Sequence, residues 1–342
     1  MTRIVIIGVD FMKRSEINNI VRKFAKPSNK RAYWQVINTL VPYLALIYIM
    51  YLMINFNVNY FFVILVSILP SLFLVRIFIL FHDCTHSSFI KSKKAMNVFG
   101  HIFGILVFTP FHKWQREHKT HHRTVGNIDK RGIGDVWTMT VDEYRSSSRL
   151  KRFGYRLYRN PLVLFIIGPF YMFVINQRLP LNMKDKKEWV SLIITNLGIL
   201  LILLTVSFTV GFRYYLLIQF PIIFVASSLG VWLFFVQHQY DEVYWESNQH
   251  WDITKAALEG SSVYRLPLVL DWFSGNIGYH NIHHLNARIP NYRLRKLYKS
   301  SDEFKDSKSV NLWQSFRLGG LFLYDQKNNR LITRRRYKKL LV

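Results

Sequence analysis

Cysteine is almost absent from this chain of 342 residues, which contains only Cys84. The chain therefore cannot form an intramolecular disulfide, and cysteine usage does not indicate its compartment. Cys84 lies inside a histidine-rich segment, where we expect it to be a small apolar filler. A thiolate ligand for a metal is the alternative.

Acidic residues are also scarce: 20 Asp and Glu stand against 46 Lys and Arg, which gives a formal net charge of +26. A strongly basic chain could bind nucleic acid or an anionic membrane surface. No nucleic-acid-binding motif accompanies the charge, so we expect no nucleic-acid partner. Hydrophobic residues make up 50% of the chain and gather in long runs with the charges between them. That pattern favours the membrane.

The N-terminus lacks the features of a signal peptide. Its apolar stretch, Ile4 to Val9, is short and is followed by the charged residues Asp10, Lys13 and Arg14. Met12 is a candidate for the true start, because the residues before it match nothing recognisable.

Four apolar runs are long enough to cross a hydrocarbon core of about 30 Å, which takes about 20 helical residues. They cover residues 34–54, 60–81, 189–208 and 214–236. The linkers within the two pairs are so short that each pair must form a tight hairpin. We therefore predict an all-α integral membrane protein with four transmembrane helices in two hairpins.

Two shorter apolar stretches do not fit a span. Phe99 to Phe111 is too brief, and Leu162 to Ile175 is interrupted by Gly168 and Pro169. We expect both to be interfacial or re-entrant helices. With only two hairpins, the N-terminus, the middle loop and the C-terminal region lie on one face of the membrane.

Charge indicates which face this is. Eight Lys and Arg precede Trp34, whereas the two hairpin linkers contain only Arg213. The positive-inside rule places the polar regions in the cytoplasm, under a cell membrane. We thus predict a cytoplasmic N-terminal segment at 1–33, a main domain at 34–301 with a cytoplasmic helical cap, and a basic cytoplasmic tail at 302–342. The basic run from Arg334 to Lys339 is expected near anionic headgroups, or else is a solvated tail.

Eight of the 12 histidines fall into three short boxes. The boxes are His82 and His86; His118, His121 and His122; and His280, His283 and His284. On a helix, residues three or four apart lie on one face, so each box directs imidazoles to one side. Chance is a poor explanation, because histidine makes up only 12 of 342 residues. The boxes therefore indicate a metal site.

The number of histidines indicates how many metals there are. Imidazole suits iron, zinc, copper or nickel, and a structural zinc ion takes only four ligands. Eight or nine histidines therefore fit two metals. His238 follows the last span on the same face as the boxes, and we expect it to be the ninth ligand. An interfacial histidine that caps the helix end is the alternative.

Ligating histidines need their other ring nitrogen held by a carboxylate or carbonyl. Asp83, within the first box, is the natural candidate for this supporting role. Asp135, Asp241 and Asp271 are weaker candidates, and Asp241 fits a surface charge better. No catalytic residue beyond the metal ligands is predicted. The other histidines lack box spacing and are expected to be ordinary residues: His101, His112 and His250.

The boxes resemble, in order and spacing, those of the membrane-bound fatty acid desaturase superfamily. The His-Asp-x-x-His form of the first box is similar to acyl-lipid desaturases rather than to acyl-CoA enzymes. Further segments resemble Bacillus-type delta-5 acyl-lipid desaturases, over residues 126–132, 134–137, 155–161, 230–234, 259–262 and 275–279. The resemblance runs from about Phe24 to about Asp325, although delta-12 and omega-3 enzymes share much of it.

This resemblance implies a mushroom-shaped helical protein that holds two iron ions at the nine histidines and uses O2 as co-substrate. It implies that an acyl chain of a membrane glycerolipid enters a kinked apolar tunnel and receives a cis double bond. A methylene C–H is not acidic, so a cofactor must carry its removal. Electrons would come from a separate ferredoxin or flavodoxin. The sequence has no haem-binding His-Pro-Gly-Gly segment, and we expect no fused cytochrome donor.

Two other functions stay open. An acyl or alkane hydroxylase would use the same metal centre, but omega-hydroxylases of the superfamily usually have a longer second box. A metal transporter would place polar ligands within its spans. Here the boxes lie beyond the span ends, and Arg76, which could snorkel, is the exception among nearly uncharged span interiors.

Overall fold

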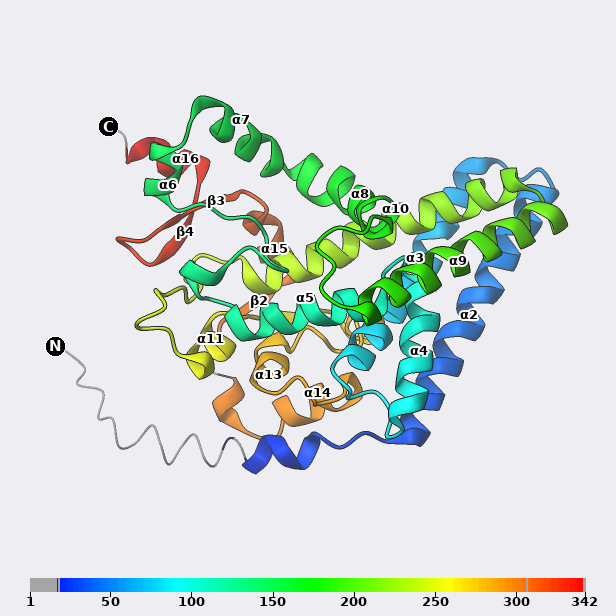
Figure 1. Ribbon diagram of the computed structural model, residues 1–342, viewed down its shortest axis with the longest axis horizontal. Helices are drawn as coiled ribbons and strands as arrows, with labels where there is room; N and C mark the ends of the chain where they lie inside the picture. The colour runs from blue at the N-terminus through cyan, green and yellow to red at the C-terminus, as the bar shows by residue number, and fades with distance from the viewer. Residues whose placement is uncertain (1–16, 18, 306, 341–342) are drawn as a thin grey trace.

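The computed structural model describes residues 17, 19–305 and 307–340, so the candidate start Met12 lies outside the described residues. Four long helices dominate the fold (Figure 1): α2 (Asn29–Asn55), α3 (Tyr60–Thr85), α9 (Lys186–Thr209) and α10 (Phe212–His238). Each is long and apolar enough to cross a membrane. Helix α3 packs against both α2 and α10, and α9 packs against α10. The four predicted span-forming helices and their pairing in two hairpins are confirmed.

Two of the long helices, α3 and α9, begin at side-chain caps, and α3 and α10 extend beyond the ends of their apolar runs. The side chain of Asn59 accepts a hydrogen bond from the backbone N–H of Phe61 at the start of α3, and Asp185 caps α9 by accepting from Glu188. At their other ends α3 continues to Thr85 and α10 to His238. The last turns of two spans therefore carry histidines into the polar region.

Two pairs of shorter helices are bent. Helices α4 (Lys93–Leu106) and α5 (Phe111–Thr124) meet at 97°. Helix α7 (Arg149–Tyr158) meets, at 62°, the following run of three elements. This run comprises η2 (Val163–Ile167), α8 (Gly168–Val174) and η3 (Asn176–Arg178). Each pair is apolar enough to be a broken span or a re-entrant loop, so the interfacial or re-entrant placement of residues 99–111 and 162–175 stays a prediction.

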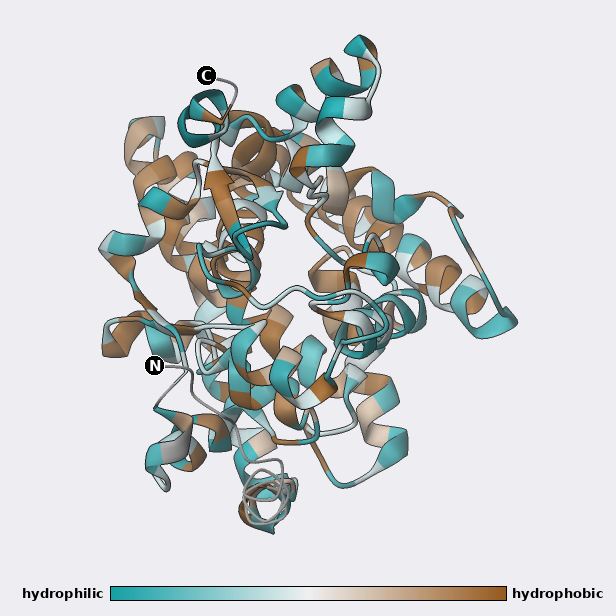
Figure 2. Ribbon diagram, turned by 90° about the vertical axis from the view of Figure 1, so that its left-hand side faces the viewer, coloured by the Kyte–Doolittle hydropathy of each residue, from teal (hydrophilic) through white to brown (hydrophobic). Residues whose placement is uncertain are grey.

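Short elements form a cap at one end of the long helices. They are η1 (Ile128–Lys130), α6 (Val141–Ser146), α11 (Ile253–Glu259), β1 (Val263–Arg265), α12 (Leu268–Phe273), α13 (His280–Leu285), α14 (Asn291–Tyr298), η4 (Asp302–Phe304), β2 (Ser309–Asn311), α15 (Leu312–Leu318), β3 (Leu321–Asp325), β4 (Arg330–Thr333) and α16 (Arg334–Lys339). Hydrophilic residues are frequent in the cap, which faces the viewer in Figure 2. Strand β1 pairs with β2 in parallel, and β3 pairs with β4 antiparallel. The all-helical prediction omitted these two small sheets.

The C-terminal stretch, expected to be a basic tail, is folded onto the cap. Strand β3 is buried along its whole length. The Tyr155 hydroxyl, from α7, donates a hydrogen bond to the backbone carbonyl of Phe322. The buried Arg159 guanidinium donates to the carbonyl of Leu321 at 2.9 Å. These contacts fix the position of α7 relative to the β3–β4 hairpin.

Arg76 does not snorkel to water. Its residue is only 3% exposed, and its Nε donates to Thr39 Oγ1 of α2 at 3.1 Å. Its Nη1 donates to the carbonyl of Trp272, and the guanidinium lies 3.9 Å from the Trp272 ring centroid. The charge is therefore satisfied inside the protein, where it joins α3 to α2 and α12.

Candidate metal centre

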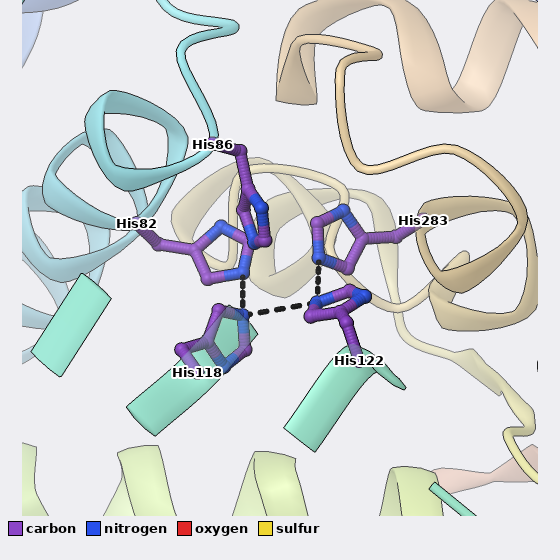
Figure 3. A group of neighbouring side chains, drawn as sticks. All are labelled: His82, His86, His118, His122 and His283. Carbon is purple, nitrogen blue, oxygen red and sulfur yellow. Dashed lines mark hydrogen bonds between the residues drawn. The ribbon is translucent and has the colours of Figure 1, made fainter. Parts of the chain in front are cut away.

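The side chains of all nine histidines predicted as ligands meet where the cap joins the long helices. Ring nitrogens of one set lie within 4.8 Å of one another (Figure 3), and this first group is His82, His86, His118, His122 and His283. A second group consists of His121, His238 and His284. His280 adjoins the second group, because its Nε2 lies 2.9 Å from His238 Nε2 and 3.1 Å from His284 Nε2.

Helical spacing explains how each box serves the two groups. His118 and His122 are four residues apart on α5 and face the first group, whereas His121 between them faces the second. On α13 the division is reversed: His283 faces the first group, and the pair four residues apart, His280 and His284, faces the second. Each His-x-x-His-His box thus divides its three rings between two neighbouring points.

The distances between ring nitrogens fit shared metal ions. In the first group the Nε2 atoms of His82 and His118 are 2.9 Å apart, and those of His118 and His122 are 3.1 Å apart. In the second group the Nε2 atoms of His121 and His238 are 3.1 Å apart. Nitrogens about 2.1 Å from one ion and at right angles around it lie about 3.0 Å from each other. The rings are therefore spaced as ligands of an ion are spaced.

The protonation state also suits metal binding. Burial, reinforced by neighbouring histidines, lowers the pKa of six predicted ligand histidines well below the usual value; they are His86, His118, His122, His280, His283 and His284. These rings are neutral near pH 7, as a metal ligand must be. His86 Nε2 is buried and has no hydrogen-bond partner among the described residues. An ion at the first group would instead be coordinated by the lone pair of this nitrogen.

Two groups outside the clusters orient the rings. Asp135 Oδ1 lies 2.6 Å from His121 Nδ1, and the carbonyl oxygen of Gly260 lies 3.2 Å from His238 Nδ1. Each acceptor favours a proton on Nδ1 and leaves the Nε2 lone pair free for a metal. Asp135 was only a secondary candidate from the sequence, and Gly260 was not considered.

Asp83 is held mainly by another partner. Its Oδ1 lies 3.5 Å from His82 Nδ1, too far for a good hydrogen bond. Its Oδ2 accepts hydrogen bonds from the backbone N–H of Asn291 at 2.8 Å and from the Asn291 side-chain amide at 2.9 Å. Asp83 thus joins the first box to the start of α14, and its support of a ligand ring stays a prediction.

The remaining polar candidates fall in neither group. Asp241 is exposed, as expected of a surface charge. Asp271 is buried on α12, and its desolvation raises the pKa to about 6. The ring centroids of His101 and His112 lie 5.4 Å apart outside both clusters. His250 is exposed, and the buried Cys84 belongs to neither group.

A cavity of about 400 Å³ reaches both histidine groups. Its wall includes His82 and His118 of the first group and His280 beside the second. Most of the lining is apolar and comes from α3, α8 and α10, for example Leu74, Phe78, Phe173, Ile223 and Leu233. A narrow apolar ligand would therefore lie against both clusters at one end of this space.

Two aromatic rings that sequence reasoning missed complete the wall. Trp114 stacks on His118 with ring centroids 4.3 Å apart, and the ring centroid of Phe234 lies 5.2 Å from that of His121. Both side chains also line the cavity. Trp114 precedes His118 by four residues, or one helical turn. That spacing could have predicted from the sequence that Trp114 lies beside the ligand.

These features define a membrane-embedded helical protein with a paired histidine centre at the end of an apolar cavity. The sequence model of the fatty acid desaturase family matches residues 60–315, and the chain belongs to this family. It is 38% identical over 330 residues to a fatty acid desaturase of Bacillus subtilis (strain 168), which covers 96% of this chain and 93% of that protein. The predicted family and its Bacillus-type likeness are confirmed.

More distant relatives carry more specific names. The chain is 29% identical over 269 residues to an sn-1 acyl-lipid omega-3 desaturase (ferredoxin) of Synechocystis, covering 70% of this chain and 68% of that protein. It is 25% identical over 266 residues to an sn-1 oleoyl-lipid 12-desaturase of Synechocystis, covering 73% of each chain. The family is thus shown to be one of lipid desaturases.

Proposed function

We propose that this protein introduces a cis double bond into an acyl chain of a membrane glycerolipid, in an O2-dependent reaction at a centre of two iron ions. The observation that carries this proposal is the cavity of about 400 Å³, whose apolar wall ends at histidines of both groups. A saturated acyl chain has no polar group near the reacting carbons, so these carbons must be selected by the shape of the cavity that holds the chain.

In this proposal the first ion is held by His82, His86, His118, His122 and His283, and the second by His121, His238, His280 and His284. The iron centre, when bound, would supply the redox chemistry that side chains lack for removing hydrogen from an unactivated methylene group. Overall, the chain loses two hydrogen atoms, and O2 takes these, two electrons and two protons to give two waters.

The protein's own groups prepare the centre for this chemistry. Neutral imidazoles present their Nε2 lone pairs, and Asp135 holds His121 in the required tautomer. Trp114 and Phe234 cover the rings on the cavity side. Their bulk would exclude water from the centre, which limits side reactions.

The cellular setting is proposed from charge and from the relatives. The basic residues outside the hairpin linkers favour a cytoplasmic cap on a cell-membrane protein. A relative whose name includes ferredoxin supports a separate ferredoxin as the electron donor, with a flavodoxin as the other candidate. The delta-5 position and the acyl-lipid substrate are proposed from the sequence segments that resemble Bacillus-type delta-5 acyl-lipid desaturases. The likeness to the Bacillus fatty acid desaturase over nearly the whole chain supports only the broader desaturase activity.

Expression in a bacterium with saturated lipids tests the proposal. The fatty acids are analysed by gas chromatography–mass spectrometry, and derivatisation locates any double bond. We expect an unsaturated acid with the wild-type protein and with His250→Ala, whose histidine is exposed and outside both groups, but none with His82→Ala. A hydroxy acid would identify a hydroxylase instead. No lipid change, with iron and donor supplied, would refute the proposal.

A further inference from the structure

Helix α7 carries an apolar face that no other part of the described chain covers. Leu150, Phe153 and Leu157 are 80%, 57% and 53% exposed. Their spacing of three and four residues places them on one side of the helix. Tyr155, which is fully buried, lies on the opposite side. In a water-soluble protein the apolar side of a surface helix packs inward. On α7 the large apolar side chains instead point away from the protein.

The cap holds α7 firmly by its buried side. The Tyr155 hydroxyl donates to the carbonyl of Phe322 and accepts from the backbone N–H of Met139 at 3.2 Å. Just beyond the helix, Arg159 donates to Gln239 Oε1 and to the carbonyl of Leu321. Rotation of the helix would break these bonds, so the apolar face of α7 keeps a fixed direction.

Charge indicates what covers this face. The ten residues of α7 include Arg149, Lys151, Arg152 and Arg156 and no acidic residue. A helix with large apolar side chains on one face and cations beside them is typical of a helix that lies in the plane of an anionic membrane. Each cation near such a surface favours binding by about 1 kcal/mol, or about fivefold.

A second short helix extends the same kind of surface. On α15, Trp313 and Phe316 are 78% and 60% exposed, and Arg317 follows them. The ring centroid of Phe316 lies 5.7 Å from that of Trp232 on α10, which places α15 beside a span. Tryptophan is enriched where a membrane meets water. In Figure 1, α7 lies on the outer edge of the molecule, between the β3–β4 hairpin and α8.

Helix α7 ends next to the cavity. Tyr158, the last residue of α7, lines the cavity, and so does Leu164 in the following element η2. Val231 of α10 completes this part of the wall. A phospholipid whose headgroup is bound by the α7 cations would therefore have its acyl chains beside the cavity lining.

We propose that α7 lies in the membrane interface, with Leu150, Phe153 and Leu157 among acyl chains, and binds the phosphate groups of anionic phospholipids through its three arginines, Arg149, Arg152 and Arg156. In this proposal the lipid bilayer itself covers the apolar face of α7. This placement rests on the fold alone. Only its consequence, delivery of a lipid chain to the cavity, rests on the proposed desaturase function.

Spin labels on the full-length protein in phosphatidylglycerol bilayers test the placement. A label at Phe153→Cys is compared with one at Lys151→Cys, which is also exposed but about 200° around the helix. The wild type, whose sole cysteine is buried, gives the background. We expect the ratio of relaxation by oxygen to relaxation by a water-soluble nickel complex to be at least tenfold higher at position 153. Equal ratios would overturn the proposal, and so would a label shielded from both reagents, which would indicate a second copy of the chain.

Lipid competition tests the role of the cations without requiring activity. Native mass spectrometry counts phosphatidylglycerol and phosphatidylcholine bound from equal mixtures. Loss of two cations at about fivefold each predicts a fall of at least tenfold in the preference for phosphatidylglycerol in Arg149→Gln/Arg156→Gln. The control Lys296→Gln/Lys299→Gln removes two exposed cations, one from the last turn of α14 and one at its C-cap, and should keep the preference. Equal preference in both variants would refute headgroup binding by α7, whereas an inactive wild type that passes both tests would refute only the desaturase function.

Discussion

Asp135 holds the ring of His121 through a contact of 2.6 Å between its Oδ1 and His121 Nδ1. The other carboxylate oxygen, Oδ2, accepts a hydrogen bond from the backbone N–H of Gly132 at 3.2 Å. The loop after α5 thereby fixes the acid, and the acid fixes the ring. His121 stands in the second histidine group but comes from the helix that also supplies the first. A change in the orientation of the His121 ring would therefore disturb the second metal position more than the first.

Replacing this acid tests its supporting role. Asp135→Asn keeps the shape but loses the negative charge, and we expect metal affinity at the second group to fall about 10- to 100-fold. Iron affinity is measured by competition with a chelator in detergent. Asp142→Asn, an exposed acid on α6, serves as the control and should have no effect. Equal affinity in the two variants would remove Asp135 from the metal site.

One ligand from each group can be removed in turn. His283→Ala affects the first group and His121→Ala the second, and we expect each to abolish activity and to lower the iron content. Membrane insertion should persist, because the four spans do not depend on these side chains. Iron per chain is measured by mass spectrometry on purified protein, with His250→Ala as the matched control. Full activity in either ligand variant would refute the ligand assignment.

Acid should destabilise the metal-free protein. The pKa values of His86, His118, His122 and His283 are lowered by burial, so the folded chain binds fewer protons than the unfolded chain below about pH 6.5. The contribution of these buried neutral rings to the free energy of unfolding is thus full above about pH 6.5. It is lost as the pH falls from there toward the pKa values of the folded protein.

Thermal unfolding of the metal-free protein in detergent measures this dependence. We expect a lower melting temperature at about pH 5.5 than at about pH 7.5. Iron-loaded protein should release its metal over the same acidic range, because protons compete for the imidazoles. A melting temperature that is constant or rises on acidification would contradict the neutral state inferred for these rings.

Gly230 keeps part of the cavity open. It lies on α10 and lines the cavity, and a Cβ atom added there would meet nothing within 4 Å. Gly230→Leu should therefore fold and keep its iron, yet lower the conversion of long acyl chains at least tenfold. Ala45→Leu on α2 is the control for added bulk, because Ala45 is exposed and lies outside the cavity. Products are compared by gas chromatography; equal conversion by both variants would place the acyl chain elsewhere.

The spans were predictable because apolar length is a direct requirement of the membrane. Their polar ends were not. The second apolar run stops at Phe81, yet α3 continues to Thr85, because the following polar residues keep helical hydrogen bonds until Ser87 adopts a φ of +58°. Apolar content shows where a helix crosses lipid but does not show where it ends. His82 consequently lies within the span helix and not after it.

The histidine boxes were predictable because helical spacing brings their members together locally. Their supporting groups depend on the path of loops. Asp135 follows His121 by 14 residues and Gly260 follows His238 by 22, and no periodicity links such positions. The β3–β4 hairpin was missed for a different reason: its strands have only five and four residues, and the surrounding basic charge suggested an exposed tail.

The most direct measurement uses purified, iron-loaded protein in bilayers of a single phospholipid with saturated chains. Reduced ferredoxin and O2 are supplied, and the released fatty acids are analysed by mass spectrometry. We predict an O2-dependent acid two mass units lighter than the substrate, with a cis double bond, and none with His82→Ala. Saturated chains that remain unchanged, while the protein retains its iron and the donor is oxidised, would contradict the account.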